Sequence, residues 1–160
     1  MTILSGQTIR KRGIFTPFAE RTKHLGMSYG VGPAGYDVRV AETFVLKPGE
    51  FKLASTLEHF DMPRDVLGKV ADKSTWARLG LAVQNTIIEP GWRGFLTLEL
   101  TNGGRETLRI VKGHPIAQII LHLLDEPAEQ PYEGKYQDQS SGAKEAVLEG
   151  AQLELPFAPV

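Results

Sequence analysis

Turn-forming residues interrupt this chain at short intervals, and their spacing limits the regular structure that it can form. The sequence contains 17 glycines and 10 prolines. Clusters at 47–50, 89–91, 102–104 and 112–115 combine Gly or Pro with polar residues, which is typical of turns. The segments between them are rich in Val, Ile, Leu, Phe and Thr. Many short strands at this spacing predict a mainly β fold, either a sandwich or a barrel.

The clearest strand is predicted over residues 95–101, where hydrophobic and polar side chains alternate. Because successive side chains of a strand point to opposite faces, the three leucines should share one face and Phe95, Thr97, Glu99 and Thr101 the other. We expect further strands over 36–40, 51–56, 67–71, 85–88, 108–111 and 117–123.

Helix is scarce in this sequence, and its last part changes in character. Short helices are predicted over 5–11, with Ser5 as N-cap, and over 74–79, beginning at Ser74. From about residue 125 to residue 142, Pro, Glu, Gln, Gly and Ser predominate. We therefore expect one β domain over 1–125 and a mobile C-terminal arm over 126–160, which either closes over the active site or is a frayed terminus.

The composition excludes several classes of function. A net charge of -1 provides no long-range field for a nucleic acid polymer. The absence of cysteine excludes disulfides, cysteine nucleophiles and cysteine-ligated zinc, and the four histidines show no ligand spacing. The apolar run 119–121 is too short to span a membrane, and residues 1–12 lack the apolar core of a signal peptide. We expect a cytoplasmic enzyme or binding domain.

One candidate binding segment lies at the start of the second predicted helix. Lys73, Ser74 and Thr75 place a cation and two hydroxyls where backbone N–H groups are free, which would suit a phosphate. Arg78 shares a helix face with Ser74 because the two are four residues apart. The alternative is an ordinary N-cap followed by an exposed arginine.

Glu99 and the arm supply the other candidates. If the face of Glu99 lines a cavity, burial would raise its pKa towards neutrality, as a general acid or base requires. If that face is solvated, Glu99 is an ordinary surface residue. On the arm, Tyr132 and the segment 134–142 offer lysine, tyrosine and amide contacts to phosphates or bases, or else form a solvated tail.

Taken together, four segments resemble the dCTP deaminase branch of the dUTPase superfamily. They cover residues 33–39, 73–81, 89–100 and 134–139, in the order found in that family. The resemblance implies a distorted jelly-roll β fold and a homotrimer with active sites between subunits. It also implies a deoxynucleoside triphosphate bound with Mg²⁺, which the phosphates and waters would largely hold.

The resemblance further implies zinc-independent hydrolysis of dCTP to dUTP and ammonia. Glu99 matches the catalytic glutamate, which takes a proton from water and relays it to the base. Ser74 matches the serine that holds this water, and Arg78 matches an arginine that orders the site electrostatically. The substrate-binding positions implied are Lys73, Thr75, Gln84, Asn85, Thr86, Glu89, Trp92, Tyr132, Lys135, Tyr136 and Gln139.

Two alternatives stay open at the level of sequence. The first is a dUTP diphosphatase, or a bifunctional enzyme, in which Glu89 takes the place of the aspartate that activates water against the α-phosphate. Glu99 and the arm segment 135–139 favour deamination over this reading. The second is a non-catalytic trimeric nucleotide-binding module. The presence of Ser74, Arg78 and Glu99 together argues against it, since a pure binder needs no carboxylate near an anionic ligand.

Overall fold

A computed structural model describes residues 2–149, and within them the chain is mainly β. The first half contains β1 (Thr2–Ile3), α1 (Gly6–Arg12), β2 (Phe15–Thr16), β3 (Thr22–His24), β4 (Met27–Gly32), β5 (Gly35–Arg39), β6 (Phe44–Leu46) and β7 (Phe51–Asp61). The second half contains β8 (Val66–Asp72), α2 (Ser74–Ala77), β9 (Leu81–Val83), β10 (Ile87–Ile88), β11 (Arg93–Asn102), β12 (Leu108–Ile110) and β13 (Pro115–Leu123). This composition of elements confirms the predicted fold class.

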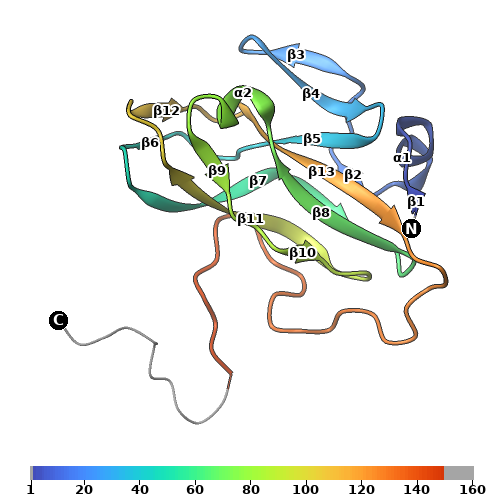
Figure 1. The fold of residues 1–160 in the computed structure, drawn as a ribbon. Helices are drawn as coiled ribbons and strands as arrows, with labels where there is room; N and C mark the ends of the chain where they lie inside the picture. The colour runs from blue at the N-terminus through green and yellow to red at the C-terminus, as the bar shows by residue number, and fades with distance from the viewer. Residues whose placement is uncertain (1, 150–160) are drawn as a thin grey trace.

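The strands form two main sheets and a small ribbon (Figure 1). The larger sheet has the order β10-β8-β13-β5-β4-β3, with β1 added alongside β13. The second sheet has the order β2-β7-β11-β9, and β12 pairs with β6 in the ribbon. All pairings between these strands are antiparallel. Strands that are adjacent in a sheet are often distant in the sequence, as in a jelly roll.

The hydrophobic core lies between the two main sheets and is built from alternating side chains. On β11, Leu98 and Leu100 are fully buried, and on β13, Ile119 and Leu121 are fully buried. Each such side chain contributes about 1.5–3 kcal/mol by leaving water. The opposite face of β11 carries Glu99, so the packing of its leucines fixes the direction in which this carboxylate points.

The predicted alternation on β11 fails at one residue, Leu96. The pairing of β11 with β7 shifts register between Phe95 and Thr97, which is a β-bulge. The Leu96 N–H consequently donates to the buried Thr56 hydroxyl at 2.9 Å instead of a backbone carbonyl. Leu96 is therefore only partly buried: it packs against the edge of the core and joins Thr97 and Glu99 in lining a cavity.

The predicted strands form with adjusted limits, and several short ones were missed. The strand expected over 85–88 is confined to Ile87–Ile88. The hairpin of β3 and β4 was not predicted, because β4 is interrupted by Gly30 and Gly32 and lacks a clear alternation. Its turn places Leu25 and Gly26 at φ 50° and 79°, a left-handed pair that suits a two-residue hairpin.

Both predicted helices form, and both are short. Helix α1 has Ser5 at its N-cap position, but the Ser5 side chain makes no capping bond to the backbone. Its hydroxyl lies 3.2 Å from that of Thr8 instead. Helix α2 ends at Ala77 because the next residues turn tightly, with the Gly80 N–H bonded to the Ala77 carbonyl at 3.0 Å.

After β13, residues 124–149 form no helix or strand and return along the body of the protein (Figure 1). An isolated parallel bridge joins Gln139 to Gly94 at the start of β11. Residues 150–160, which include the end of the predicted arm, lie outside the described part of the chain. Among the described residues, no helix has the length and apolarity needed to cross a membrane.

Candidate active site

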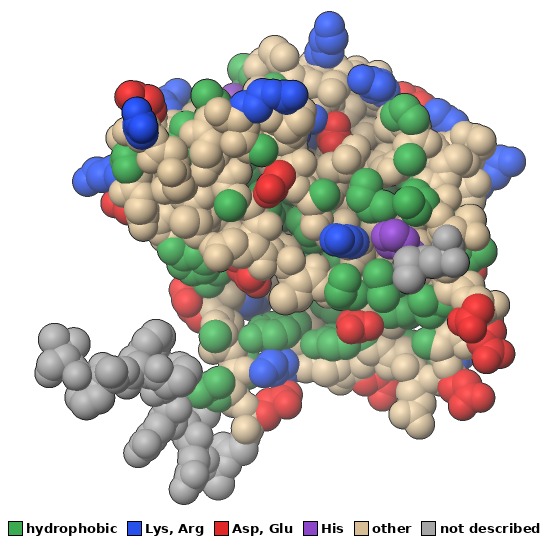
Figure 2. Space-filling view, viewed as in Figure 1, with side chains coloured by type: hydrophobic (Ala, Val, Ile, Leu, Met, Phe, Trp, Pro, Cys, Tyr) green, Lys and Arg blue, Asp and Glu red, His purple; other side chains and the backbone are tan. Residues whose placement is uncertain are grey.

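A cavity of about 610 Å³ lies between β11, the segment 85–89 and the returning C-terminal segment. In the space-filling view, hydrophobic side chains gather beside the hollow between the body and this segment (Figure 2). Eight of the predicted site residues line the cavity: Asn85, Thr86, Glu89, Trp92, Glu99, Tyr132, Tyr136 and Gln139. The structure therefore brings together residues of two of the four family segments, 89–100 and 134–139, with Asn85, Thr86 and Tyr132 from outside them.

Glu99 is the half-buried carboxylate of this cavity. It lies on β11, opposite Leu53 of β7, and both side chains line the cavity. Partial burial raises the pKa of Glu99 above its usual range. Within residues 2–149 its carboxylate takes part in no hydrogen bond or ion pair, so it is free to accept a proton or bind a ligand.

The backbone around Glu99 is held by the side chain of Asn85. The Asn85 Nδ2 donates to the carbonyl of Thr97 at 2.6 Å, and its Oδ1 accepts from the N–H of Glu99 at 3.1 Å. One residue earlier in the chain, the backbone N–H of Gln84 donates to the Glu99 carbonyl at 2.8 Å. The amide of Asn85 thus continues the pairing of β9 with β11 after β9 has ended at Val83.

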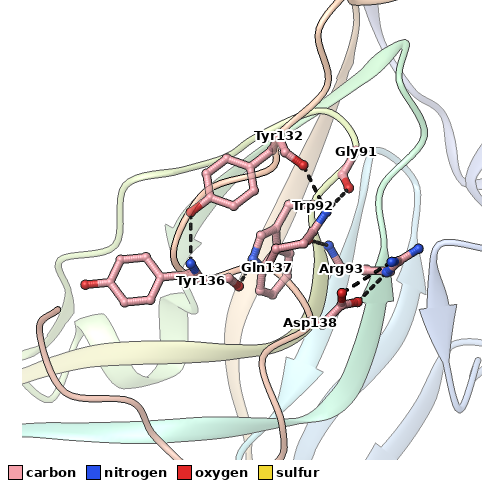
Figure 3. Close-up of polar contacts among 7 residues, drawn as sticks. All are labelled: Gly91, Trp92, Arg93, Tyr132, Tyr136, Gln137 and Asp138. Atoms are coloured by element: carbon pink, nitrogen blue, oxygen red, sulfur yellow. Dashed lines mark hydrogen bonds and ion pairs between the residues drawn. The ribbon is translucent and has the colours of Figure 1, made fainter. Parts of the chain in front are cut away.

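The C-terminal segment is fastened to the turn that carries Trp92 (Figure 3). Gln137 makes two of these contacts, donating to the Gly91 carbonyl and accepting from the Arg93 N–H, both at 2.9 Å. Within the segment it also donates to the Tyr132 carbonyl at 2.9 Å. The Trp92 Nε1 donates to the Tyr136 carbonyl at 2.7 Å. The segment is therefore attached to one wall of the cavity by hydrogen bonds between uncharged groups.

Two further contacts join the same segment to the cavity. The Thr97 hydroxyl accepts from the Gln139 side-chain amide and from the Lys144 N–H, the latter at 3.0 Å. Beside these contacts, the guanidinium of Arg93 pairs with Asp138 in an exposed ion pair, which holds the pKa of Asp138 below its usual range. Gln137 and Thr97 were missed in the sequence, because an amide or hydroxyl at one of many polar positions carries no signal before its partners are known.

A second cavity, of about 630 Å³, lies between the β3–β4 hairpin and the start of α2. Predicted site residues Lys73, Ser74 and Thr75 line this cavity and not the first. Its other lining residues are Arg21, Thr22, Lys23, Gly26, Met27 and Ser28. Within one chain, the predicted phosphate-binding segment and Glu99 therefore belong to two separate cavities.

Three predicted site residues line neither cavity. Arg78 is exposed, and its guanidinium donates to the Ser74 carbonyl at 3.3 Å. The Gln84 side-chain oxygen accepts from the Thr101 hydroxyl. The Lys135 ammonium donates to the Val147 carbonyl and lies 5.4 Å from the ring centroid of Tyr136.

The two cavities differ sharply in charge. The first is lined by the carboxylates of Glu89, Glu99 and Glu145 and by one cation, Lys144. The second is lined by three cations and no carboxylate. Among residues 2–149, no group of three His, Asp or Glu side chains is arranged to hold a metal ion. The donors present suit a polar organic ligand in the first cavity and an anion in the second.

Comparisons with known proteins agree on one family. A family model described as dCTP deaminase-like matches residues 36–124. The dCTP deaminase of Campylobacter hominis is 35% identical over 173 residues, covering 88% of this chain and 91% of that protein. The dCTP deaminase of Azotobacter vinelandii is 34% identical over 181 residues, covering 88% of this chain and 96% of that protein.

Solved structures of similar fold are dUTPases. The native EIAV dUTPase is 26% identical with a TM-score of 0.53, covering 63% of this chain and 84% of that chain. The dUTPase of Staphylococcus bacteriophage 80alpha is 20% identical with a TM-score of 0.55, covering 74% of this chain and 92% of that chain. These neighbours confirm the predicted distorted jelly roll of the dUTPase type.

Proposed function

This chain belongs to the dCTP deaminase-like family of enzymes, and we propose that it catalyses the hydrolysis of dCTP to dUTP and ammonia. The observation that carries this proposal is the half-buried Glu99, whose unpaired carboxylate faces a cavity with apolar and aromatic walls. A general base with a raised pKa suits this reaction, because it must take a proton and then release it near neutral pH.

In the proposed reaction, water attacks C4 of the cytosine while N3 gains a proton. Glu99 removes one proton from this water and passes it to N3. The second proton of the attacking water then moves from the C4 hydroxyl to the amino group, so that ammonia leaves C4 as the carbonyl forms. The cavity walls support this assignment because Leu53 and Leu96 exclude water around the carboxylate. We place the deoxyribose beside Trp92 and Glu89.

We further propose that the cytosine edge is read by backbone groups of residues 84–86. Both polar atoms of the Asn85 side chain bond to the backbone of β11, which supports a role for the backbone of this segment in reading the base. Tyr132, Tyr136 and Gln139 line the cavity on the arm side, which supports the proposal that the arm over 126–160 closes on the nucleotide bound to domain 1–125.

The charge of the two cavities supports a site shared between subunits. The first cavity has an excess of carboxylates and would repel a triphosphate, whereas the second has the cations and hydroxyls that bind one. We propose that in a homotrimer Lys73, Ser74, Thr75 and Arg78 of one subunit approach Glu99 of the next. Lys135 would reach the phosphates from the arm.

A complementation experiment tests the shared site directly. E99Q and S74A should each be inactive alone, because each lacks one half of every site. If subunits are mixed and reassembled at equal amounts, about a quarter of the sites regain both intact halves, as random assortment around a closed ring requires. Activity that stays absent after verified mixing would place both residues in the same half-site.

We propose that the reaction uses Mg²⁺ bound to the nucleotide and no zinc. The chain has no cysteine, and the described residues contain no cluster of three metal-binding side chains, so the phosphates and waters would supply the ligands of Mg²⁺. When bound, the ion neutralises phosphate charge. The side chains of this protein would bind and orient the phosphates and carry the proton transfer at Glu99.

A second candidate function is hydrolysis of dUTP to dUMP and diphosphate, alone or combined with deamination. The observation that favours it is that Glu89 lines the same cavity as Glu99 and is exposed to solvent, where it could activate water. Incubation with Mg²⁺ and either dCTP or dUTP, followed by chromatography, separates the alternatives. Conversion of dCTP to dUTP with ammonia supports deamination, dUMP from dUTP supports the diphosphatase, and inertness towards both supports a binding module.

A further inference from the structure

The cavity between the β3–β4 hairpin and the start of α2 contains two cations that lie outside every segment discussed in the sequence. Lys23 lies on β3 and Arg21 immediately precedes this strand; both are exposed side chains that line this cavity. Among the described residues, neither takes part in an ion pair. Their charge is therefore available to a ligand.

Lys73, the cation expected to bind phosphate, is already neutralised within the chain. It is buried, with 8% of its surface exposed, and its Nζ lies 2.8 Å from Oδ2 of Asp37. The pair contributes no net charge to the cavity. The positive charge that a polyanion would meet there comes from Arg21 and Lys23 instead.

The hairpin holds these two side chains in a defined arrangement. Lys23 is the cross-strand partner of Ser28, so these two share one face of the hairpin, and Arg21 lies directly before β3 at the edge of the same cavity. At its base, the carbonyl of Ala19 accepts from the Val31 N–H at 3.0 Å, and the Ala19 N–H donates to the buried Tyr36 hydroxyl at 2.9 Å. Hydrogen bonds at Ala19 thus fix the start of the segment that contains Arg21 and Lys23.

We propose that Arg21 and Lys23 bind the phosphate chain of the nucleotide and make this enzyme prefer a triphosphate to a monophosphate. This inference rests on the proposed function for the identity of the nucleotide. A monophosphate needs few donors, and the hydroxyls of Ser74 and Thr75 line the same cavity. A triphosphate adds further negative charges, and among the described residues Arg21 and Lys23 are the cations that line this cavity without an ion-pair partner.

The test is the double variant R21A/K23A, assayed with dCTP and with dCMP. We expect the KM for dCTP to rise about tenfold or more at low salt, because charge-assisted bonds to phosphate are lost, while kcat changes by less than about twofold. The KM for dCMP should change far less. The swapped variant R21K/K23R should restore most of the affinity, and K11A/R105A, exposed cations that line neither cavity, should behave as wild type.

A binding measurement keeps this inference separate from the proposed reaction. Inorganic tripolyphosphate, titrated calorimetrically into the wild-type protein and into R21A/K23A, reports the phosphate contacts without any deamination. We expect the double variant to bind it at least about tenfold more weakly. Equal binding to both proteins, or no binding to either, would overturn the inference even if dCTP is deaminated. If R21A/K23A loses tripolyphosphate binding but the wild-type protein does not deaminate dCTP, the phosphate site is supported and the proposed reaction is rejected.

Discussion

The side-chain amide of Asn85 stands in for a backbone peptide group next to Glu99, whose N–H it accepts at 3.1 Å. The same amide donates to the Thr97 carbonyl at 2.6 Å, so it bonds to the backbone on both sides of Leu98. A primary amide has the donor and acceptor of a peptide, and here it extends the sheet beyond the last residue of β9. The position of the catalytic candidate therefore depends on a side chain that never needs to touch the substrate.

Replacing Asn85 by alanine should lower kcat more than it raises KM. The loss of both bonds frees the backbone of β11 at Glu99, and small displacements of a reacting group cost about tenfold to a hundredfold in rate. In N85D a second carboxylate beside Glu99 should also move the acid limb of the pH–rate profile to higher pH. As a control, T43V removes a hydrogen bond from the Lys112 N–H to a residue that lines neither cavity, and it should change neither kcat nor the pH profile. An unchanged kcat in N85A would contradict the positioning role of Asn85.

Glu99 should control the acid side of the pH profile. Its pKa is raised by burial, so the basic form is lost at a higher pH than for a solvated glutamate, and kcat/KM should fall as pH drops through that raised value. E99Q should abolish turnover while binding dCTP. Turnover of E99Q near the wild-type rate would remove Glu99 from the mechanism.

The same shift predicts an effect of Glu99 on stability. A carboxyl with a raised pKa in the folded state contributes stability at low pH that is lost as pH rises through the folded-state pKa. E99Q should therefore have a higher thermal midpoint than wild type at pH 7, and the difference should shrink towards pH 4. A constant difference across this range would mean that desolvation of the charge is not its cause.

Arg39 and Glu58 form a buried ion pair away from both cavities. Burial raises the pKa of Glu58 even though Arg39 donates to both of its carboxylate oxygens through Nε at 2.7 Å and the backbone N–H at 2.8 Å. R39A would leave this carboxylate unpaired and should lower the free energy of unfolding by about 3–5 kcal/mol. Urea unfolding should show that R39A loses more unfolding free energy at pH 8 than at pH 5, because only the charged form of Glu58 is destabilised by burial without a partner.

Gln137 should matter more to the arm than the ion pair beside it. Q137A removes three hydrogen bonds to the turn 91–93 and to Tyr132, so trypsin should cut after Lys135 and Lys144 faster and the KM for dCTP should rise. D138N removes only an exposed ion pair, which contributes little. Equal cleavage rates in the two variants would show that the amide contacts do not hold the arm.

The sequence alone predicted the structure correctly where local interactions determine it. Alternation along 95–101 placed Glu99 opposite the buried Leu98 and Leu100, because the period of a strand is set by its own backbone. The exception at Leu96 depends on the Thr56 hydroxyl, which is 40 residues away in the chain. No pattern within the strand could indicate that bulge.

The cations of the hairpin were missed for a similar reason. Arg21 and Lys23 resemble any pair of surface cations until tertiary folding sets their strand beside Lys73 and Ser74. The pairing of Lys73 with Asp37 likewise joins two segments 36 residues apart. The separation of the predicted site into two cavities also follows from the three-dimensional arrangement and not from the order of the motifs.

The end of β9 at Val83 has a consequence for how such an enzyme can diverge. Because the Asn85 amide closes the sheet beside Glu99, the chain leaves β11 at Thr86 and then enters β10, which begins at Ile87 and pairs with β8 instead. Insertions, deletions or exchanges in this short stretch would reshape the wall that meets the base without shifting the carboxylate. Selectivity for the nucleobase and the catalytic step can therefore evolve as separate traits within one fold.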